Sequence, residues 1–396
     1  MTEQGPTGPV ELAMEHSVVI CAGPGGVGKT TTAAALALWA ARGGRRACVV
    51  TIDPARRLAD ALGLDALDDQ PRRVEMPDPV PAGGELWALM LDTKRTFDGL
   101  VRRYAPDEAQ AEAILTNRFY RNVSGALSGT HEYMAVEKLY ELHSSGRFDL
   151  VVVDTPPTRN ALDFLDAPRR LLRFLNNRIF RMLMLPTKAG LRAVNVAAQL
   201  LMRTLSRVVG GEVVGDAIDF FSVFEGMEQG FRERAGRVEE LLSASGTAYV
   251  VVAAAHRDAV EEAAYFADRL AEAHLAVSAL VFNRMLPRFG PAAESGSPGP
   301  RSTEPGSRGP RADDLAALLD PAHAGGPNPE LAALAANLHQ LAEMARGEEA
   351  HVAALAARAP DATIARVPYL ADEVHDLPGL VVVGDHLFGR PARPPG

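Results

Sequence analysis

The chain has few cysteines, few lysines and no long hydrophobic run. Cys21 and Cys48 are its only cysteines, which excludes a disulfide framework and a four-cysteine metal site. No uninterrupted apolar stretch approaches the roughly 18 residues that a membrane-spanning helix needs. The N-terminal segment also lacks the basic and apolar regions of a signal peptide. We therefore expect a cytoplasmic protein with no transmembrane segment, in which both thiols are buried in strands.

Positive charge is scarce as well. The 41 Lys and Arg residues against 50 Asp and Glu give a formal net charge of −9, and only four of the basic residues are lysines. This balance disfavours a protein that binds nucleic acid through a strongly basic surface. Hydrophobic residues make up 47% of the 396 residues, which is enough for a sizeable core and excludes global disorder.

Short β-branched runs separated by long helical stretches organise the chain. Near-continuous apolar runs such as residues 151–153 and 250–252 suit strands that are covered on both faces. Their alternation with helices predicts an α/β fold: a mostly parallel, doubly wound sheet flanked by helices. The expected strands are residues 17–22, 46–52, 85–91, 148–154, 247–254, 275–283 and 363–367.

Several intervals depart from this alternation. Residues 290–311 contain 14 Gly, Pro or Ser among 22 positions, a composition typical of a flexible loop. Two other intervals have apolar residues at helical spacing and no strand signal, which predicts a helical insertion. We expect a single domain over residues 16–388, with the insertion at about 93–145 and 160–245, and disordered tails at 1–15 and 389–396.

The strongest functional signal follows the first strand. Residues 23–30 match G-x-x-x-x-G-K-[ST], the pattern of a phosphate-binding loop, with an Ala/Leu-rich helix after it. Glycines let backbone N–H groups turn toward phosphate oxygens, and the helix points its positive end at the same anion. Lys29 then reaches the β- and γ-phosphates, and the Thr30 hydroxyl ligates Mg²⁺ directly. The expected ATP contacts here are Gly23, Pro24, Gly25, Gly26, Val27, Gly28, Lys29, Thr30 and Thr31.

Two aspartates end expected strands. Asp53 lies in Thr-Ile-Asp-Pro-Ala and Asp154 in Val-Asp-Thr-Pro-Pro-Thr. Ligands of parallel sheets bind outside the carboxyl ends of the strands, so both carboxylates are placed to face the phosphate loop and to hold Mg²⁺ through water. The structural alternatives are a helix N-cap at Asp53 and a turn aspartate at Asp154.

Together these motifs resemble the ArsA and Get-pathway ATPases, the latter known for targeting tail-anchored proteins, and most of all their actinobacterial, anion-transporting-ATPase-like branch. The resemblance extends over residues 17–388 apart from the glycine-rich loop, and it includes Val-Phe-Asn-Arg at 281–284 and Ala-Arg-Val-Pro-Tyr-Leu at 365–370. It implies a P-loop NTPase fold and a dimeric ATPase that uses ATP and Mg²⁺.

The resemblance also implies roles for individual residues. Asp53 belongs to switch I and polarises the water that attacks the γ-phosphate, so Asp53 and Lys29 are the expected catalytic residues. Asn283 reads the adenine. The expected switch II residues are Asp154, Thr155, Pro156, Pro157 and Thr158, and the loop expected to flank the base is Pro368, Tyr369 and Leu370.

Two departures from the family pattern bear on function. Pro24 stands where many members carry a lysine that reaches across the dimer to the other subunit's nucleotide. The Cys-x-x-Cys that joins Get-pathway dimers through zinc is missing, so we expect no zinc. The sequence thus leaves open whether the dimer is a homodimer or a heterodimer with a lysine-bearing paralogue.

The leading hypothesis is a dimeric ATPase whose nucleotide state controls binding of a client, and a protein with a hydrophobic segment is one candidate client. Met182, Met184 and Met202 in the insertion suit such a client surface, although they equally suit the insertion's own core. A regulatory ATP-binding subunit of a heteromeric ATPase is the alternative. A MinD/ParA-type positioning ATPase is disfavoured, because the chain ends without a basic amphipathic helix.

Overall fold

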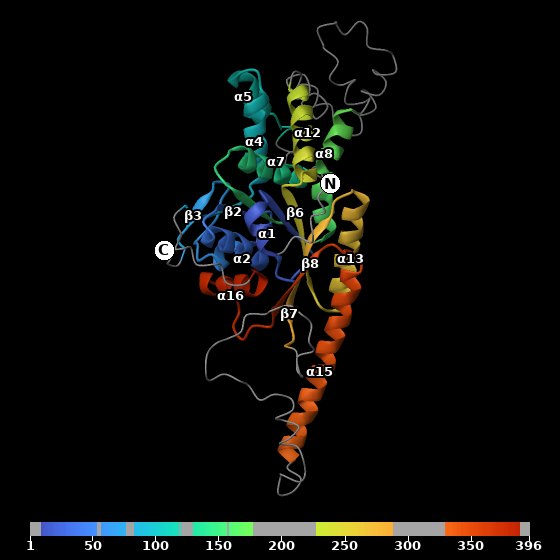
Figure 1. Ribbon diagram of the computed structural model, residues 1–396. Coiled ribbons are helices and arrows are strands. Elements are labelled where there is room, and N and C mark those ends of the chain that lie inside the picture. The colour runs from blue at the N-terminus through green and yellow to red at the C-terminus, as the bar shows by residue number, and fades with distance from the viewer. Residues whose placement is uncertain are drawn as a thin grey trace.

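One eight-stranded sheet forms the centre of the protein (Figure 1). The computed structural model describes residues 9–53, 57–76, 83–118, 120, 130–156, 158–176, 227–287 and 329–388. Its helices are α1 (Pro9–Glu15), α2 (Lys29–Arg42), α3 (Arg57–Ala61), α4 (Thr93–Tyr104), α5 (Glu108–Thr116), α7 (Thr130–Ser144), α8 (Thr158–Leu175), α12 (Glu228–Ser243), α13 (Arg257–Glu272), α15 (Pro329–Ala356) and α16 (Leu377–Phe388). Its strands are β1 (Val18–Ala22), β2 (Arg46–Thr51), β3 (Arg72–Val74), β4 (Glu85–Met90), β5 (Leu150–Asp154), β6 (Thr247–Ala254), β7 (Val277–Met285) and β8 (Thr363–Pro368).

The strand order is β3-β4-β2-β5-β1-β6-β7-β8. Every pairing is parallel except that of β3 with β4. All seven expected strands are present, with ends that differ by at most two residues, so the predicted α/β fold of the P-loop NTPase type is confirmed. Among the strands that the structure describes, only β3, a three-residue antiparallel edge strand, was not predicted.

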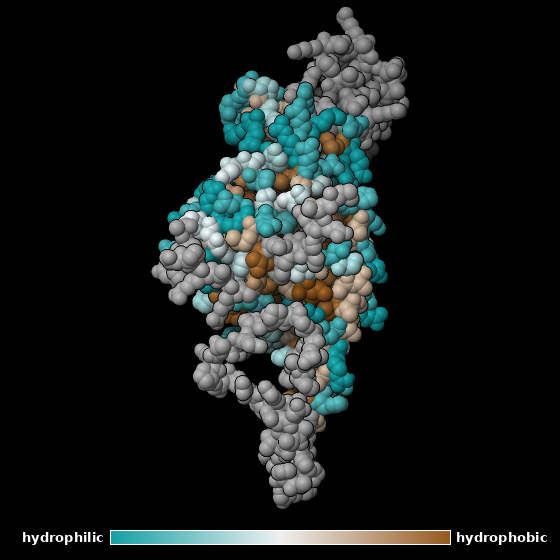
Figure 2. All heavy atoms as spheres, in the orientation of Figure 1, coloured by the Kyte–Doolittle hydropathy of each residue, from teal (hydrophilic) through white to brown (hydrophobic). Residues whose placement is uncertain are grey.

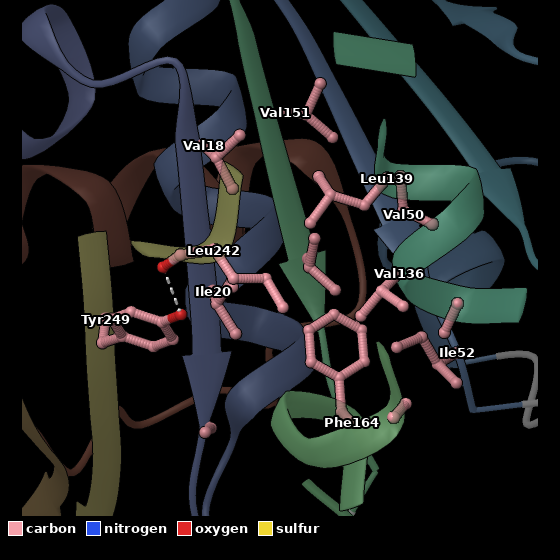
Figure 3. Packing of buried hydrophobic residues seen from close by; sticks show 14 of the residues in the cluster. Val18, Ile20, Val50, Ile52, Val136, Leu139, Val151, Phe164, Leu242 and Tyr249 are labelled. Atoms are coloured by element: carbon pink, nitrogen blue, oxygen red, sulfur yellow. Dashed lines mark hydrogen bonds between the residues drawn. The ribbon is translucent and has the colours of Figure 1, made fainter. Parts of the chain in front are cut away.

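The sheet is buried on both faces because its strands are apolar at successive positions. In β1, Val18 and Ile20 join one core cluster, whereas Val19 and Cys21 join the other. The first cluster includes residues of α4, α5, α7, α8, α12, α13 and α15, and the second includes residues of α1, α2, α3 and α16. Figure 3 shows the first core, in which Ile20 of the sheet and Val136 of α7 lie close to Phe164 of α8. This double coverage is the doubly wound arrangement that the sequence predicts.

Both cysteines lie inside this sheet, as expected. Cys21 in β1 and Cys48 in β2 are free and fully buried. Burial raises the pKa of both thiols, because the charged thiolate would lose its hydration. They are inert core residues at neutral pH.

The prediction of a disordered tail over residues 1–15 is wrong for residues 9–15, which form α1. Leu12 and Ala13 are buried in the second core, and the Arg45 guanidinium donates to the Ala13 carbonyl at 2.5 Å. The burial of these two apolar residues and the hydrogen bond from Arg45 fix α1 against the second core, although the Pro/Gly-bearing composition of the segment suggested disorder. Residues 1–8 and the predicted tail 389–396 lie outside the described residues.

Five described helices fall within the predicted insertion: α4, α5, α7, α8 and α12. They rise above the sheet in Figure 1, and their visible surface in Figure 2 is largely hydrophilic. The methionines expected at 182–202 and the loop at 290–311 lie outside the described residues. None of the helices that the structure describes combines the length and apolarity needed to cross a membrane.

A buried ion pair ties α12 to α7. The Arg234 guanidinium donates to both carboxylate oxygens of Glu137, with Nε at 2.8 and 3.0 Å, and it lies 4.0 Å from the centre of the Tyr140 ring. Arg234 and Glu137 are only 5% and 2% exposed. Burial raises the pKa of Glu137, and the Arg234 guanidinium opposes that shift. Each charge therefore depends on the other for compensation.

Replacing one partner of this pair should strongly destabilise the fold. Arg234→Ala leaves the Glu137 carboxylate buried without its cation, which costs about 3–5 kcal/mol of unfolding free energy. Urea denaturation measures this loss. Arg257→Ala is the matched control, because Arg257 pairs with Glu261 on the exposed surface of α13. Equal effects of the two substitutions would contradict a structural role for the buried pair.

Candidate nucleotide site

The loop at residues 23–28 joins β1 to α2 and has a backbone that favours glycine. Gly28 is the N-cap of α2 and adopts a left-handed conformation with φ of 95°. A side chain on Gly23 would meet the Val252 carbonyl oxygen of β6 at 2.0 Å. The loop therefore passes close to the neighbouring strand, and α2 begins with its free N–H groups facing the loop, as an anion site requires.

Lys29 is the first residue of α2 and is buried. Its Nζ donates a hydrogen bond to the Pro24 carbonyl at 2.8 Å, so the side chain folds back over the loop. Burial lowers the pKa of Lys29, while the nearby carboxylates of Asp154 and Asp53 oppose that shift. The amine is thus a poorly hydrated cation at the centre of the loop, suited to an anionic ligand.

Asp154 ends β5 and is almost fully buried. Its Oδ2 accepts hydrogen bonds from the Thr30 hydroxyl at 2.7 Å and from the Thr51 hydroxyl at 3.0 Å. Burial raises the pKa of Asp154 to about 6, and the two hydroxyls and Lys29 oppose the shift. The three residues come from β5, α2 and β2, so one carboxylate joins the phosphate loop to two strand ends.

The residues at this point suit Mg²⁺. The buried Asp154 Oδ1 has no hydrogen-bond partner among the described residues, and the Thr30 hydroxyl lies beside the same carboxylate. A hydroxyl and carboxylate oxygens are the hard ligands that Mg²⁺ prefers, and it usually retains several waters. An unpaired, buried acceptor next to a phosphate loop is therefore explained by a hydrated cation.

Asp53 lies two residues beyond β2 and is half-buried. Its backbone N–H donates to the Thr51 hydroxyl at 3.3 Å, which links it to the Asp154 cluster. Its negative charge raises the pKa values of both Lys29 and Asp154. Asp53 thus lies on the phosphate-loop side of the sheet edge, and the next three residues, 54–56, lie outside the described residues.

Thr155, the second expected switch II residue, is fixed to β1. Both its backbone N–H and its hydroxyl donate to the Cys21 carbonyl, at 3.2 and 2.9 Å. Pro156 is half-buried, Pro157 lies outside the described residues, and Thr158 begins α8. Thr155 thus connects the end of β1, which leads into the phosphate loop, to the segment that leads into α8.

A second part of the site is a cavity of about 340 Å³ on the other side of the phosphate loop. The Asn283 side-chain amide donates to the Val27 carbonyl at 2.9 Å, which joins β7 to the loop. The residue Tyr369 is 65% exposed beside the cavity. The lining residues are Gly28, Thr31, Asn283, Arg284, Pro368, Tyr369, Leu370, Ala371, Asp372, Glu373, Val374 and Val383.

The structure brings the expected residues together in two groups that share the phosphate loop. Lys29, Thr30, Asp53 and Asp154 gather at one end, and Asn283 and residues 368–370 line the cavity at the other. Sequence reasoning missed Thr51, although a hydroxyl two residues before Asp53 was a visible signal. It also missed Arg284 and residues 371–374, whose sequence has no phosphate-binding or catalytic pattern.

Comparison with known proteins agrees with this geometry. The family model described as anion-transporting ATPase matches residues 16–291. Protein Rv2184c of Mycobacterium tuberculosis is 36% identical over 157 residues, covering 37% of this chain and 36% of that protein. ATPase GET3 of Malassezia globosa is 29% identical over 157 residues, covering 40% and 44% of the two chains.

A longer match, 31% identical over 278 residues, is to the uncharacterized protein SCO2128 of Streptomyces coelicolor. It covers 69% of this chain and 64% of that protein. The matches thus span less than two thirds of each of these relatives. Because the family model covers well over half of the sequence and the phosphate loop, the chain belongs to the anion-transporting ATPase (ArsA ATPase) family.

Proposed function

We propose that the protein binds ATP with Mg²⁺ and hydrolyses it to ADP and phosphate. The observation that carries this proposal is the buried Asp154 carboxylate bound to the hydroxyls of Thr30 and Thr51 beside Lys29. A relative from Malassezia globosa that aligns with part of this chain is named an ATPase, which supports the same activity. The cavity beyond Asn283 supplies room for a nucleoside next to the loop.

Each residue has a distinct task in this proposal. Lys29 exchanges its hydrogen bond to the Pro24 carbonyl for the β- and γ-phosphate oxygens. Thr30 would hold Mg²⁺ directly, and Asp53 and Asp154 would hold it through water. Bound Mg²⁺ neutralises charge on the phosphates. Asp53 orients the attacking water and accepts its proton as the bond to the γ-phosphorus forms, while the bond from the γ-phosphorus to the bridging β-phosphate oxygen breaks and ADP leaves.

Hydrolysis in turn is proposed to act as a switch in a dimer. The γ-phosphate holds Asp53 and the segment after Asp154 in one arrangement, and its release frees them. Thr155 couples that segment to β1, and α8 follows directly, so the helices above the sheet are the elements that would respond. Through them the nucleotide state would control a client or partner protein.

Pro24 favours a second version of this function. Its side chain carries no charge, and Lys29 is the only lysine of the loop. A subunit without a second phosphate-binding cation could depend on a lysine-bearing paralogue in a heterodimer. In that case the protein would be the regulatory ATP-binding subunit of a heteromeric ATPase.

Lys29→Ala tests the assignment of the phosphate loop. Removing the cation leaves the phosphates poorly compensated, a cost of about 2–5 kcal/mol in binding. We expect nucleotide binding or hydrolysis to be lost in calorimetry and phosphate-release assays, with an unchanged far-UV CD spectrum. Lys94→Ala, which removes an exposed lysine of α4, serves as the control. Wild-type hydrolysis by Lys29→Ala would show that this loop is not the phosphate site.

Asp53→Asn tests the role of the second aspartate. The amide keeps the shape of the carboxylate but cannot accept a proton from the attacking water, so turnover should fall by about 10²-fold or more. Binding of ATP and Mg²⁺ should persist in equilibrium titrations. If binding and turnover fall together, Asp53 has a structural role instead.

Pro24→Lys separates the two versions of the function. A cation supplied to the transferring phosphoryl group is worth roughly 10³–10⁵ in rate. The isolated protein should therefore hydrolyse ATP slowly, and Pro24→Lys or mixing with a lysine-bearing paralogue should accelerate it. The rate constant is measured in each mixture. A fast isolated enzyme that neither change affects would exclude the heteromeric version.

A further inference from the structure

The carboxyl end of β7 has an irregular backbone at Arg284. Arg284 has a left-handed φ of 57°, which is uncommon for a residue other than glycine and costs free energy. The register between β7 and β8 shifts at the same point, between Phe282 and Met285. The Arg284 backbone N–H donates to the side-chain oxygen of Asn283 at 2.9 Å. The irregularity is therefore built into the strand end.

This backbone has a consequence for the cavity. Successive residues of a regular strand point to opposite faces, so Asn283 and Arg284 would be directed apart. Instead both line the same cavity. Bulges near functional sites commonly redirect one side chain in this way. The unfavourable φ is thus the means by which Arg284 reaches the cavity.

Arg284 and Tyr369 lie at adjacent strand ends. The Tyr369 backbone N–H donates to the Met285 carbonyl at 2.7 Å, and Met285 pairs with Pro368 across β7 and β8. The residue Tyr369 is 65% exposed, and Arg284 is also exposed. A planar cation and an aromatic ring thus border one cavity with their surfaces open to a ligand.

We propose that the Arg284 guanidinium stacks on the purine base of the bound nucleotide, beside the loop at residues 368–370 that the family resemblance already implies to flank the base. This inference rests on the proposed binding of ATP in the cavity. Asn283 contacts the phosphate loop through Val27, and Arg284, the next residue in the chain, lines the same cavity as Tyr369. Planar guanidinium groups and aromatic rings both stack on bases.

Arg284→Gly separates this role from a purely structural one. Glycine takes φ of 57° without cost, so the melting temperature should rise. Loss of the stacked guanidinium should at the same time weaken ATP binding about tenfold. Tripolyphosphate, which has no base, should bind both proteins equally. The measurements are thermal unfolding without ligand and competition against a fluorescent, ribose-labelled ATP in the presence of Mg²⁺.

Two further variants control for backbone and charge. His274 also has a left-handed φ, 59°, and does not line the cavity, so His274→Gly should raise the melting temperature and leave ATP affinity unchanged. Arg284→Lys keeps the charge but loses the plane, and should bind ATP as weakly as Arg284→Gly.

Two results would overturn the inference while leaving ATP binding intact. In the first, Arg284→Gly binds ATP as tightly as the wild type. In the second, it loses affinity for ATP and tripolyphosphate alike, which would make Arg284 a phosphate contact. Failure of the wild type to bind ATP would instead refute the proposed function, and this inference with it.

Discussion

The nucleotide site depends on one buried carboxylate. Asp154 accepts hydrogen bonds from Thr30 at the start of α2 and from Thr51 at the end of β2, while belonging itself to β5. Burying a carboxylate without such donors would strongly destabilise the folded protein. The two hydroxyls and the nearby Lys29 reduce this cost for Asp154. In return the carboxylate fixes the phosphate loop against two central strands. The loop is thereby ordered before any ligand arrives, which lowers the entropic cost of binding.

The base side of the site is constructed differently. Its walls come from the ends of β7 and β8 and from the segment before α16, which is distant in sequence from the phosphate loop. Residues 368–374 and Val383 also lie beyond the part of the chain that matches the family model, residues 16–291. The parallel topology brings them together, since every carboxyl end in such a sheet lies at the same edge. In the proposed site, phosphate binding and base binding would therefore be carried by separate parts of the chain, with Asn283 as the contact between them.

The sequence predicted most of the fold because its signals were local. Apolar β-branched runs marked seven strands, and the glycine pattern marked the loop that precedes α2. The strand β3 was missed because Arg-Arg-Val has no apolar run, and its pairing at the sheet edge depends on β4 rather than on its own composition. Helix α1 was missed because Leu12 and Ala13 become buried only once α2 and α16 are in place. Thr51 and Arg284 were missed as candidate site residues for a similar reason: only the register of neighbouring strands brings Thr51 to Asp154 and Arg284 to the cavity.

Lys29 and Arg284 illustrate two ways in which a fold prepares a cation for a ligand. Lys29 is held by a hydrogen bond to the Pro24 carbonyl, a neutral acceptor that compensates a buried ammonium group less well than an anion does. Arg284 has an unfavourable, left-handed φ angle, and its side chain is exposed. In both cases the free energy of the unliganded protein contains a small unfavourable term. In the proposed site, a bound nucleotide would relieve that term at Lys29 and would contact the side chain that it positions at Arg284. In the proposed site, the incompletely compensated charge of Lys29 would favour phosphate binding, whereas the strained backbone of Arg284 would place its guanidinium beside the base.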